Sequence, residues 1–153
     1  MINIHKILLE KKQTYKTYSL KTDKPFDSIL DEIGGDIKNG LQIVGLHNID
    51  FTQREFFNFA NIVRELTGMF DVLLFVFEQI EISKLISADG IVLNKNTLNI
   101  SEVKKLAEDR FAIGYFADKS NDILYAKENY YDFVITDLKN ENIDIIQFSE
   151  FKG

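Results

Sequence analysis

Short apolar runs rich in β-branched residues alternate with segments of helical period along this chain. The clearest run is 88–94, Ala-Asp-Gly-Ile-Val-Leu-Asn, in which an aspartate–glycine turn leads into apolar residues that end abruptly in a polar one. A buried parallel strand has this pattern where its carboxyl end opens on a site. Similar runs lie at 18–22, 41–46, 72–77, 111–116 and 131–136, with a weaker one at 143–148. The alternation predicts an α/β fold with a parallel sheet and right-handed crossovers.

Helix signals fill the intervals between these runs. Pro25 suits the first position of a helix, and the glycine pair at 34–35 is expected to weaken or interrupt that helix before a carboxyl cap at Gly40. The segment 52–55, Thr-Gln-Arg-Glu, has the spacing of a capping box. Apolar residues at helical spacing within 4–8 predict a further amphipathic helix that closes one end of the body.

Two architectures fit alternating strands and helices. An open doubly wound sheet normally carries a glycine-rich fingerprint after its first strand, and Thr-Asp-Lys-Pro at 22–25 is unlike one. A closed barrel needs eight strands and typically about 250 residues. The 153 residues therefore predict a single domain, 1–153, shaped as a truncated (β/α) TIM-type barrel with about six or seven parallel strands and an N-terminal helix.

Composition excludes several classes of function. The net charge of −6 argues against nucleic acid and anionic membranes as partners. The absence of cysteine excludes disulfides, thiolate zinc sites and cysteine nucleophiles. No apolar run approaches the roughly 20 residues that span a bilayer, and no signal peptide opens the chain, so a cytoplasmic location is expected.

The segment from about Tyr18 to Asp137 resembles the thiamine phosphate synthase/TenI family. The first strand, Tyr-Ser-Leu-Lys-Thr-Asp at 18–23, is similar to that family's Leu-Tyr-Leu-Val-Thr-Asp. Further motifs resemble those of the family at 40–44 (Gly-Leu-Gln-Ile-Val), 50–55 (Asp-Phe-Thr-Gln-Arg-Glu), 88–93 (Ala-Asp-Gly-Ile-Val-Leu), 112–114 (Ala-Ile-Gly) and 131–134 (Tyr-Asp-Phe-Val). The resemblance implies the family's barrel scaffold over most of the chain.

The family's chemical residues are mostly replaced at the matching positions. Its Gln-Leu-Arg-x-Lys, which holds the pyrimidine pyrophosphate, falls on Gly-Leu-His-Asn-Ile at 45–49, so the bidentate phosphate donor is missing. Glu78 stands where the family has a magnesium-ligand aspartate, and its second metal-binding aspartate falls on Thr97. Its phosphate-binding serine falls on Phe116, and the histidine of TenI-type thiazole tautomerases falls on Asp118. The family's last two βα units have no counterpart.

Polar side chains gather at the predicted carboxyl ends of the strands: Asp23, His47, Asn48, Glu78, Asn94, Lys95, Asp118 and Asp137. If these residues line a pocket, Glu78, Asp118 and Lys95 are the catalytic candidates. His47, Asn48, Asn94 and Asp137 are then the substrate-binding candidates. The alternative is that strand ends are polar only because they meet solvent and cap the next helix.

Glu78 has two interpretations, because it follows a wholly apolar strand. Its carboxylate could hold a metal or act as a base. The alternative is a helix amino-terminal carboxylate that faces the helix dipole. A metal site on His5 and His47 is disfavoured, since their separation is unlike any ligand spacing.

Three functional hypotheses remain open. The first is a degenerate family member without synthase activity that binds a small molecule, such as a phosphate, or a partner near thiamine metabolism. The second is an active thiamine phosphate synthase or thiazole tautomerase-like enzyme that uses Glu78, for which magnesium would be the cofactor. The third is a structural dimer module. An incomplete barrel leaves strand edges exposed, and a homodimer is expected to cover them.

Overall fold

The computed structural model describes residues 14–94, 99–108, 110–117, 120–137 and 143–147. The strands are β1 (Tyr15–Leu20), β2 (Ile43–Asn48), β3 (Leu73–Phe77), β4 (Gly90–Leu93), β5 (Ala112–Ala117), β6 (Phe133–Asp137) and β7 (Ile143–Gln147). The helices are α2 (Phe26–Lys38), α3 (Gln53–Met69), α4 (Ile80–Leu85), α5 (Ile100–Ala107) and α6 (Ser120–Glu128). The amphipathic helix expected at 4–8 lies outside the described residues. No helix in the described part of the chain is both long and apolar enough to span a bilayer.

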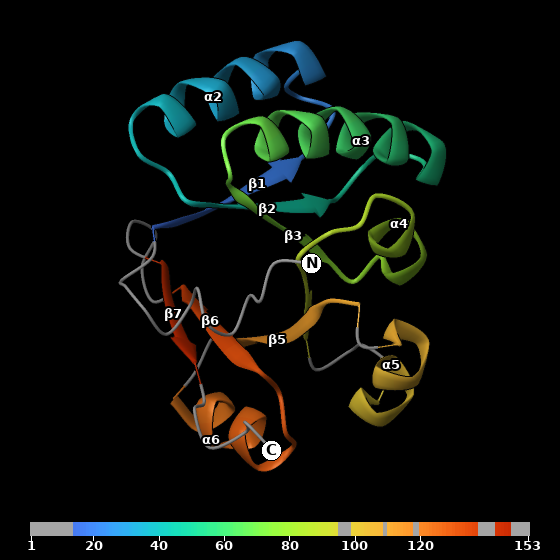
Figure 1. The fold of residues 1–153 in the computed structure, drawn as a ribbon, viewed down its shortest axis with the longest axis vertical. Helices are drawn as coiled ribbons and strands as arrows, with labels where there is room; N and C mark the ends of the chain where they lie inside the picture. The colour runs from blue at the N-terminus through green and yellow to red at the C-terminus, as the bar shows by residue number, and fades with distance from the viewer. Residues whose placement is uncertain (1–13, 95–98, 109, 118–119, 138–142, 148–153) are drawn as a thin grey trace.

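The strands form one sheet in the order β1-β2-β3-β4-β5-β6-β7. The first six are parallel and make an open half-barrel with the helices outside it, as Figure 1 shows. The predicted truncated barrel is therefore confirmed. β7 comes near β1, although no ladder in this sheet joins the two.

The seventh strand exists, but it runs antiparallel to β6 and does not extend the parallel set. Only residues 138–142 separate the two strands. A parallel connection needs a crossover of a dozen or more residues, whereas a hairpin needs only a few. The short link therefore dictates the reversed direction.

The helix signals are largely confirmed, with one exception. Thr52 and Glu55 form the predicted capping box with both reciprocal hydrogen bonds. The C-cap residue of α2 is Asn39, and Gly40 follows it with φ +103°. The expected interruption at Gly34 and Gly35 is wrong, because α2 continues through both glycines to Lys38. Its buried isoleucine stripe, Ile29, Ile33 and Ile37, stabilises the helix by packing, which outweighs the low propensity of glycine.

The aspartates of two family-like motifs stabilise the sheet. Asp89 accepts hydrogen bonds from the Leu74 amide and from Arg64 Nη1, both at 2.9 Å, and its own amide donates to the Leu74 carbonyl. Asp132 repeats this arrangement at the next-but-one strand, where its carboxylate accepts from the Ile113 amide at 2.8 Å. Each aspartate thereby fixes the amino end of one strand to its neighbour.

Inward-facing glycines make room for large rings inside the half-barrel. The inner core comprises Tyr15, Ile43, Leu73, Phe75, Phe77, Val92, Ala112, Phe133 and Ile135. A Cβ on Gly114 would fall within the Phe133 ring, one on Gly90 would lie 2.8 Å from Phe75, and one on Gly45 would overlap the Tyr15 hydroxyl. The rings fill the space that these three glycines leave, so the lower interior is a packed core.

Candidate functional site

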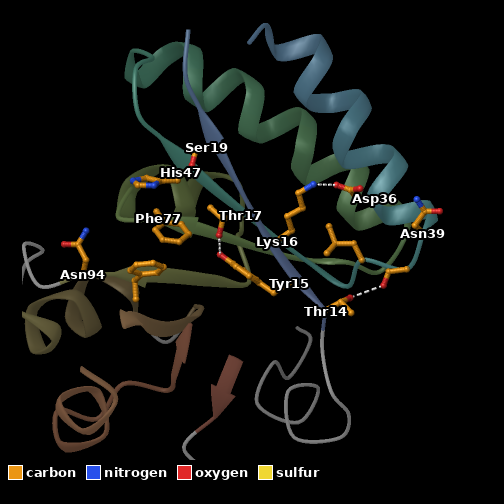
Figure 2. A pocket seen from close by; sticks show the side chains of 13 residues that line it. Thr14, Tyr15, Lys16, Thr17, Ser19, Asp36, Asn39, His47, Phe77 and Asn94 are labelled. Carbon is orange, nitrogen blue, oxygen red and sulfur yellow. Dashed lines mark hydrogen bonds and ion pairs between the residues drawn. The ribbon is translucent and has the colours of Figure 1, made fainter. Parts of the chain in front are cut away.

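One cavity of about 870 Å³ opens along the inner face of β1 and the carboxyl ends of the neighbouring strands. Its upper part is lined by one inward-facing residue from, or directly after, each of the first five strands: Ser19, His47, Phe77, Asn94 and Phe116. Its lower part continues past Tyr15 and Thr17 to the turn between α2 and β2 (Figure 2). The volume is within the range of small-molecule sites, about 300–1,000 Å³.

His47 and Phe77 form an aromatic wall of the cavity. Their ring centroids are 4.8 Å apart with planes inclined by 21°, and Phe116 approaches Phe77 at 6.1 Å in a tilted arrangement. Stacked and tilted rings at these separations attract one another and present a flat apolar face. Phe77 and Phe116 are lining residues, and a cavity remains beside them.

The His47 side chain is half-buried and its pKa is lowered from the usual value. Burial is the larger cause, and the negative charge of the Glu78 carboxylate opposes it. A lowered pKa keeps the imidazole neutral at pH 7. The neutral ring has one nitrogen that donates a hydrogen bond and one that accepts.

Lys16 is the only cation among the described residues that line the cavity. Its Nζ donates to Glu32 at 2.9 Å and to Asp36 at 2.8 Å, and Figure 2 shows it directed toward Asp36 on α2. Burial opposes the ionisation of Asp36, but hydrogen bonds from Lys16 and Tyr18 outweigh it and lower its pKa. The lysine charge is thus balanced by two carboxylates on the outer side of β1.

Of the substrate-binding candidates, His47 and Asn94 are brought together in the cavity. Asn48 instead bridges its own loop, where its amide group donates to the Phe51 carbonyl and accepts from the Phe51 amide. Asp137 is the last residue of β6, and its side chain is outside the described part of the chain.

The catalytic candidates are only partly placed. Lys95 and Asp118 lie outside the described residues. Glu78 follows β3 in a left-handed conformation, φ +63°, and its amide donates to the Val92 carbonyl. Within the described residues no group of three or more histidine, aspartate and glutamate side chains could hold a metal ion, so metal binding by Glu78 stays a prediction.

The lining residues that were absent from the predicted site include Tyr15, Thr17 and Ser19. All three lie on the inner face of β1, which begins three residues before the predicted strand. Alternation along 15–20 was the signal that could have identified them, since every second residue of a strand faces the same side.

Comparison with known proteins identifies the family of this chain. A family model described as Thiamine monophosphate synthase matches residues 19–136. The thiamine-phosphate synthase of Clostridium novyi is 30% identical over 123 residues, which cover 78% of this chain and 60% of the relative. A putative thiamine-phosphate synthase 2 of Aquifex aeolicus is 28% identical over 120 residues, covering 78% and 64%. The chain thus spans about 60% of the length of these curated relatives.

Solved structures agree on the fold. Thiamine phosphate pyrophosphorylase from Pyrococcus furiosus superposes with a TM-score of 0.70 at 22% identity, and the match covers 84% of this chain and 61% of that one. At this identity the likeness concerns the fold alone.

Proposed function

Because the chain belongs to the thiamine monophosphate synthase family, we propose that it binds an uncharged aromatic heterocycle of thiamine metabolism without performing synthase chemistry. One observation carries the proposal: the cavity wall is aromatic, and its nearest polar groups are the neutral side chains of Ser19, His47 and Asn94. A thiazole or an aminopyrimidine is planar and offers ring nitrogens and short polar arms. Such a ring suits a wall of this kind.

A pyrophosphate is poorly matched to the described cavity. Tight phosphate sites use arginine pairs, lysines, metal ions or a helix amino terminus to offset the charge. The position of the family's phosphate-holding arginine is occupied by His47, whose burial lowers its pKa and so favours the neutral ring at pH 7. Lys16, the remaining cation among the described lining residues, is held by Glu32 and Asp36.

A second candidate function is an active enzyme that uses Glu78. The observation that favours it is the left-handed backbone of Glu78, a conformation that costs free energy in a residue other than glycine. Such conformations cluster at functional sites, and the Glu78 charge acts on His47. A carboxylate next to an imidazole could transfer a proton to or from a bound heterocycle.

Isothermal titration calorimetry distinguishes the two. The titrants are hydroxyethylthiazole, the aminopyrimidine alcohol, the thiazole phosphate and the pyrimidine pyrophosphate, each with and without magnesium. We expect at least one uncharged ring to bind more tightly than its phosphorylated form, with no effect of magnesium.

Turnover assays complete the test. Release of pyrophosphate from the mixed substrates, or tautomerisation of a thiazole carboxylate, followed by its loss in Glu78→Gln, would replace the binding proposal with the enzyme. Failure of every titrant to bind would remove both small-molecule functions and leave the structural dimer module.

A further inference from the structure

Two hydroxyl groups lie in the lower part of the cavity, beneath the aromatic wall. Thr17 Oγ1 donates to Tyr15 Oη at 2.7 Å, and Figure 2 shows both groups on the inner side of β1. Both residues line the cavity. The Tyr15 ring also packs against Phe75, with centroids 6.1 Å apart, so the hydroxyl is fixed in place by the inner core.

The Tyr15–Thr17 pair has one hydroxyl proton that the hydrogen bond between the two groups does not use. Two hydroxyls carry two protons, and one bond between them occupies one, whichever group donates. No other residue in the described part of the chain accepts the second proton. Tyr15 is only 7% exposed, and buried phenol groups normally have a hydrogen-bond partner. Burial raises the pKa of the phenol, so it keeps its proton at neutral pH.

The path from the aromatic wall to this pair is short and unobstructed by a side chain of β2. Ser19 pairs with His47 in the sheet, and Thr17 pairs with Gly45. Ser19 and Thr17 are consecutive inward-facing residues of β1, which places them about 7 Å apart along the strand. Gly45 has no side chain, and the space over it is taken by the Tyr15 hydroxyl and the adjoining edge of the Tyr15 ring. An arm on a ring at His47 must span this distance to reach the pair.

We infer that the Tyr15–Thr17 pair is a second subsite, which donates a hydrogen bond to an uncharged acceptor atom on the arm of the bound ring. The inference rests on the proposed function, because the ring must first occupy the aromatic wall. The inference specifies that the arm of the ligand carries a polar acceptor atom. An alcohol, ether or carbonyl oxygen satisfies the spare donor, whereas an alkyl arm leaves the donor unpaired and desolvated.

The test compares hydroxyethyl-methylthiazole with ethyl-methylthiazole, which differ in one oxygen atom. The wild-type chain is expected to bind the alcohol about fivefold to tenfold more tightly, the ratio that one net hydrogen bond supplies. Tyr15→Phe and Thr17→Val each remove one hydroxyl of the pair, and we expect both to reduce the preference to about twofold or less. Tyr18→Phe is the matched control, since its hydroxyl bonds to Asp36 on the outer side of the same strand, and it should keep the wild-type preference.

Two kinds of result would overturn the inference. Equal affinity of the wild type for the two thiazoles, or an unchanged preference in Tyr15→Phe and Thr17→Val, removes the subsite and leaves the proposed function standing. Binding of neither thiazole removes both. A crystal structure of the whole chain provides a readout independent of affinity: an acceptor atom of the protein within about 3.2 Å of either hydroxyl, in place of the arm oxygen, contradicts the inference.

Discussion

The His47 imidazole lies face to face with the Phe77 ring, with centroids 4.8 Å apart and planes inclined by 21°. Both residues point inward from adjacent strands of the half-barrel. An imidazolium ion in this half-buried position would lose hydration, so burial favours the neutral ring. The pair therefore links the polarity of the cavity to pH.

The first prediction concerns the effect of His47 protonation on the free energy of unfolding. The folded-state pKa of His47 is lowered, so the unfolded chain binds a proton at a higher pH than the folded chain does. At pH 7.5 neither state is charged at His47, and the residue contributes no pH dependence. As the pH falls through about 6.5, the ordinary histidine pKa, protonation favours the unfolded state and the free energy of unfolding decreases. The slope for one proton cannot exceed about 1.4 kcal/mol per pH unit.

Urea unfolding at intervals between about pH 7.5 and pH 5.5 measures this effect, because most carboxylates stay ionised in that window. His47→Gln should flatten the curve. His5→Gln is the matched control, since His5 is the other of the two histidines in the chain, and it should leave the His47 slope in place. A slope that survives His47→Gln would contradict the prediction.

The second prediction concerns the aromatic wall. Phe116→Leu removes a ring from the cavity but keeps an apolar side chain of moderate size. We expect affinity for hydroxyethylthiazole to fall about threefold to tenfold, which corresponds to the loss of one aromatic contact. Phe70→Leu also removes a ring, but from an exposed position outside the cavity, and should bind like the wild type in the same calorimetric titration. Equal affinities of the two variants would place the ligand elsewhere.

The third prediction concerns Asp89. Asp89→Ala would remove the partner of the Leu74 amide and leave the Arg64 charge unpaired in a partly buried position. We expect the free energy of unfolding to fall by about 2–4 kcal/mol, as measured by urea denaturation. Glu108→Gln breaks the ion pair with Lys84 at a fully exposed carboxylate and should change stability little. Similar losses in both variants would mean that the Asp89 bonds add nothing specific.

The fourth prediction concerns the glycines inside the sheet. Gly114→Ala would force its new methyl group into the Phe133 ring, and overpacking of this kind typically costs about 1–3 kcal/mol. The double variant with Phe133→Leu should lose less stability than the two single losses combined. Gly68→Ala lies in α3 with nothing within 4 Å of the added atom, and it should stabilise by about 0.5–1 kcal/mol. If the losses of stability in the two single variants simply add in the double variant, the contact between the new methyl group and the Phe133 ring is contradicted.

The fifth prediction is that the chain forms a homodimer. Within the described sheet β1 pairs only with β2, which leaves the other side of the strand without a ladder. Sedimentation velocity over a concentration series is expected to show a dimer that dissociates on dilution. A monomer at every concentration would remove the expectation.

Hydrophobic pattern was sufficient to predict the central strands and most helices. Leu73–Phe77 and Gly90–Leu93 are buried along their whole length, so a continuous apolar run identifies them. β1 was misplaced because Lys16 and Thr17 interrupt its apolar pattern. These side chains are polar since one reaches carboxylates on α2 and the other faces the cavity. The residues that obscured the strand are thus among those that form the site.

The site could be predicted in part from strand ends alone. His47 and Asn94 were found because they follow apolar runs and point inward. The aromatic contribution of Phe77 and Phe116 was harder to assign, since a phenylalanine at the end of a buried run has the same pattern whether it packs in the core or lines a cavity. The direction of β7 depends on the length of the connection at 138–142, and the spacing of apolar residues gives no information on strand direction.

The antiparallel β7 also limits how this half-barrel could be extended into a full barrel. Gln147 lies opposite Phe133, so β7 finishes at the end of the sheet away from the cavity mouth. A strand that followed directly could pair with it only by turning back in a second hairpin. Adding a parallel strand directly beside β6 would therefore require β7 to be replaced by a helical crossover.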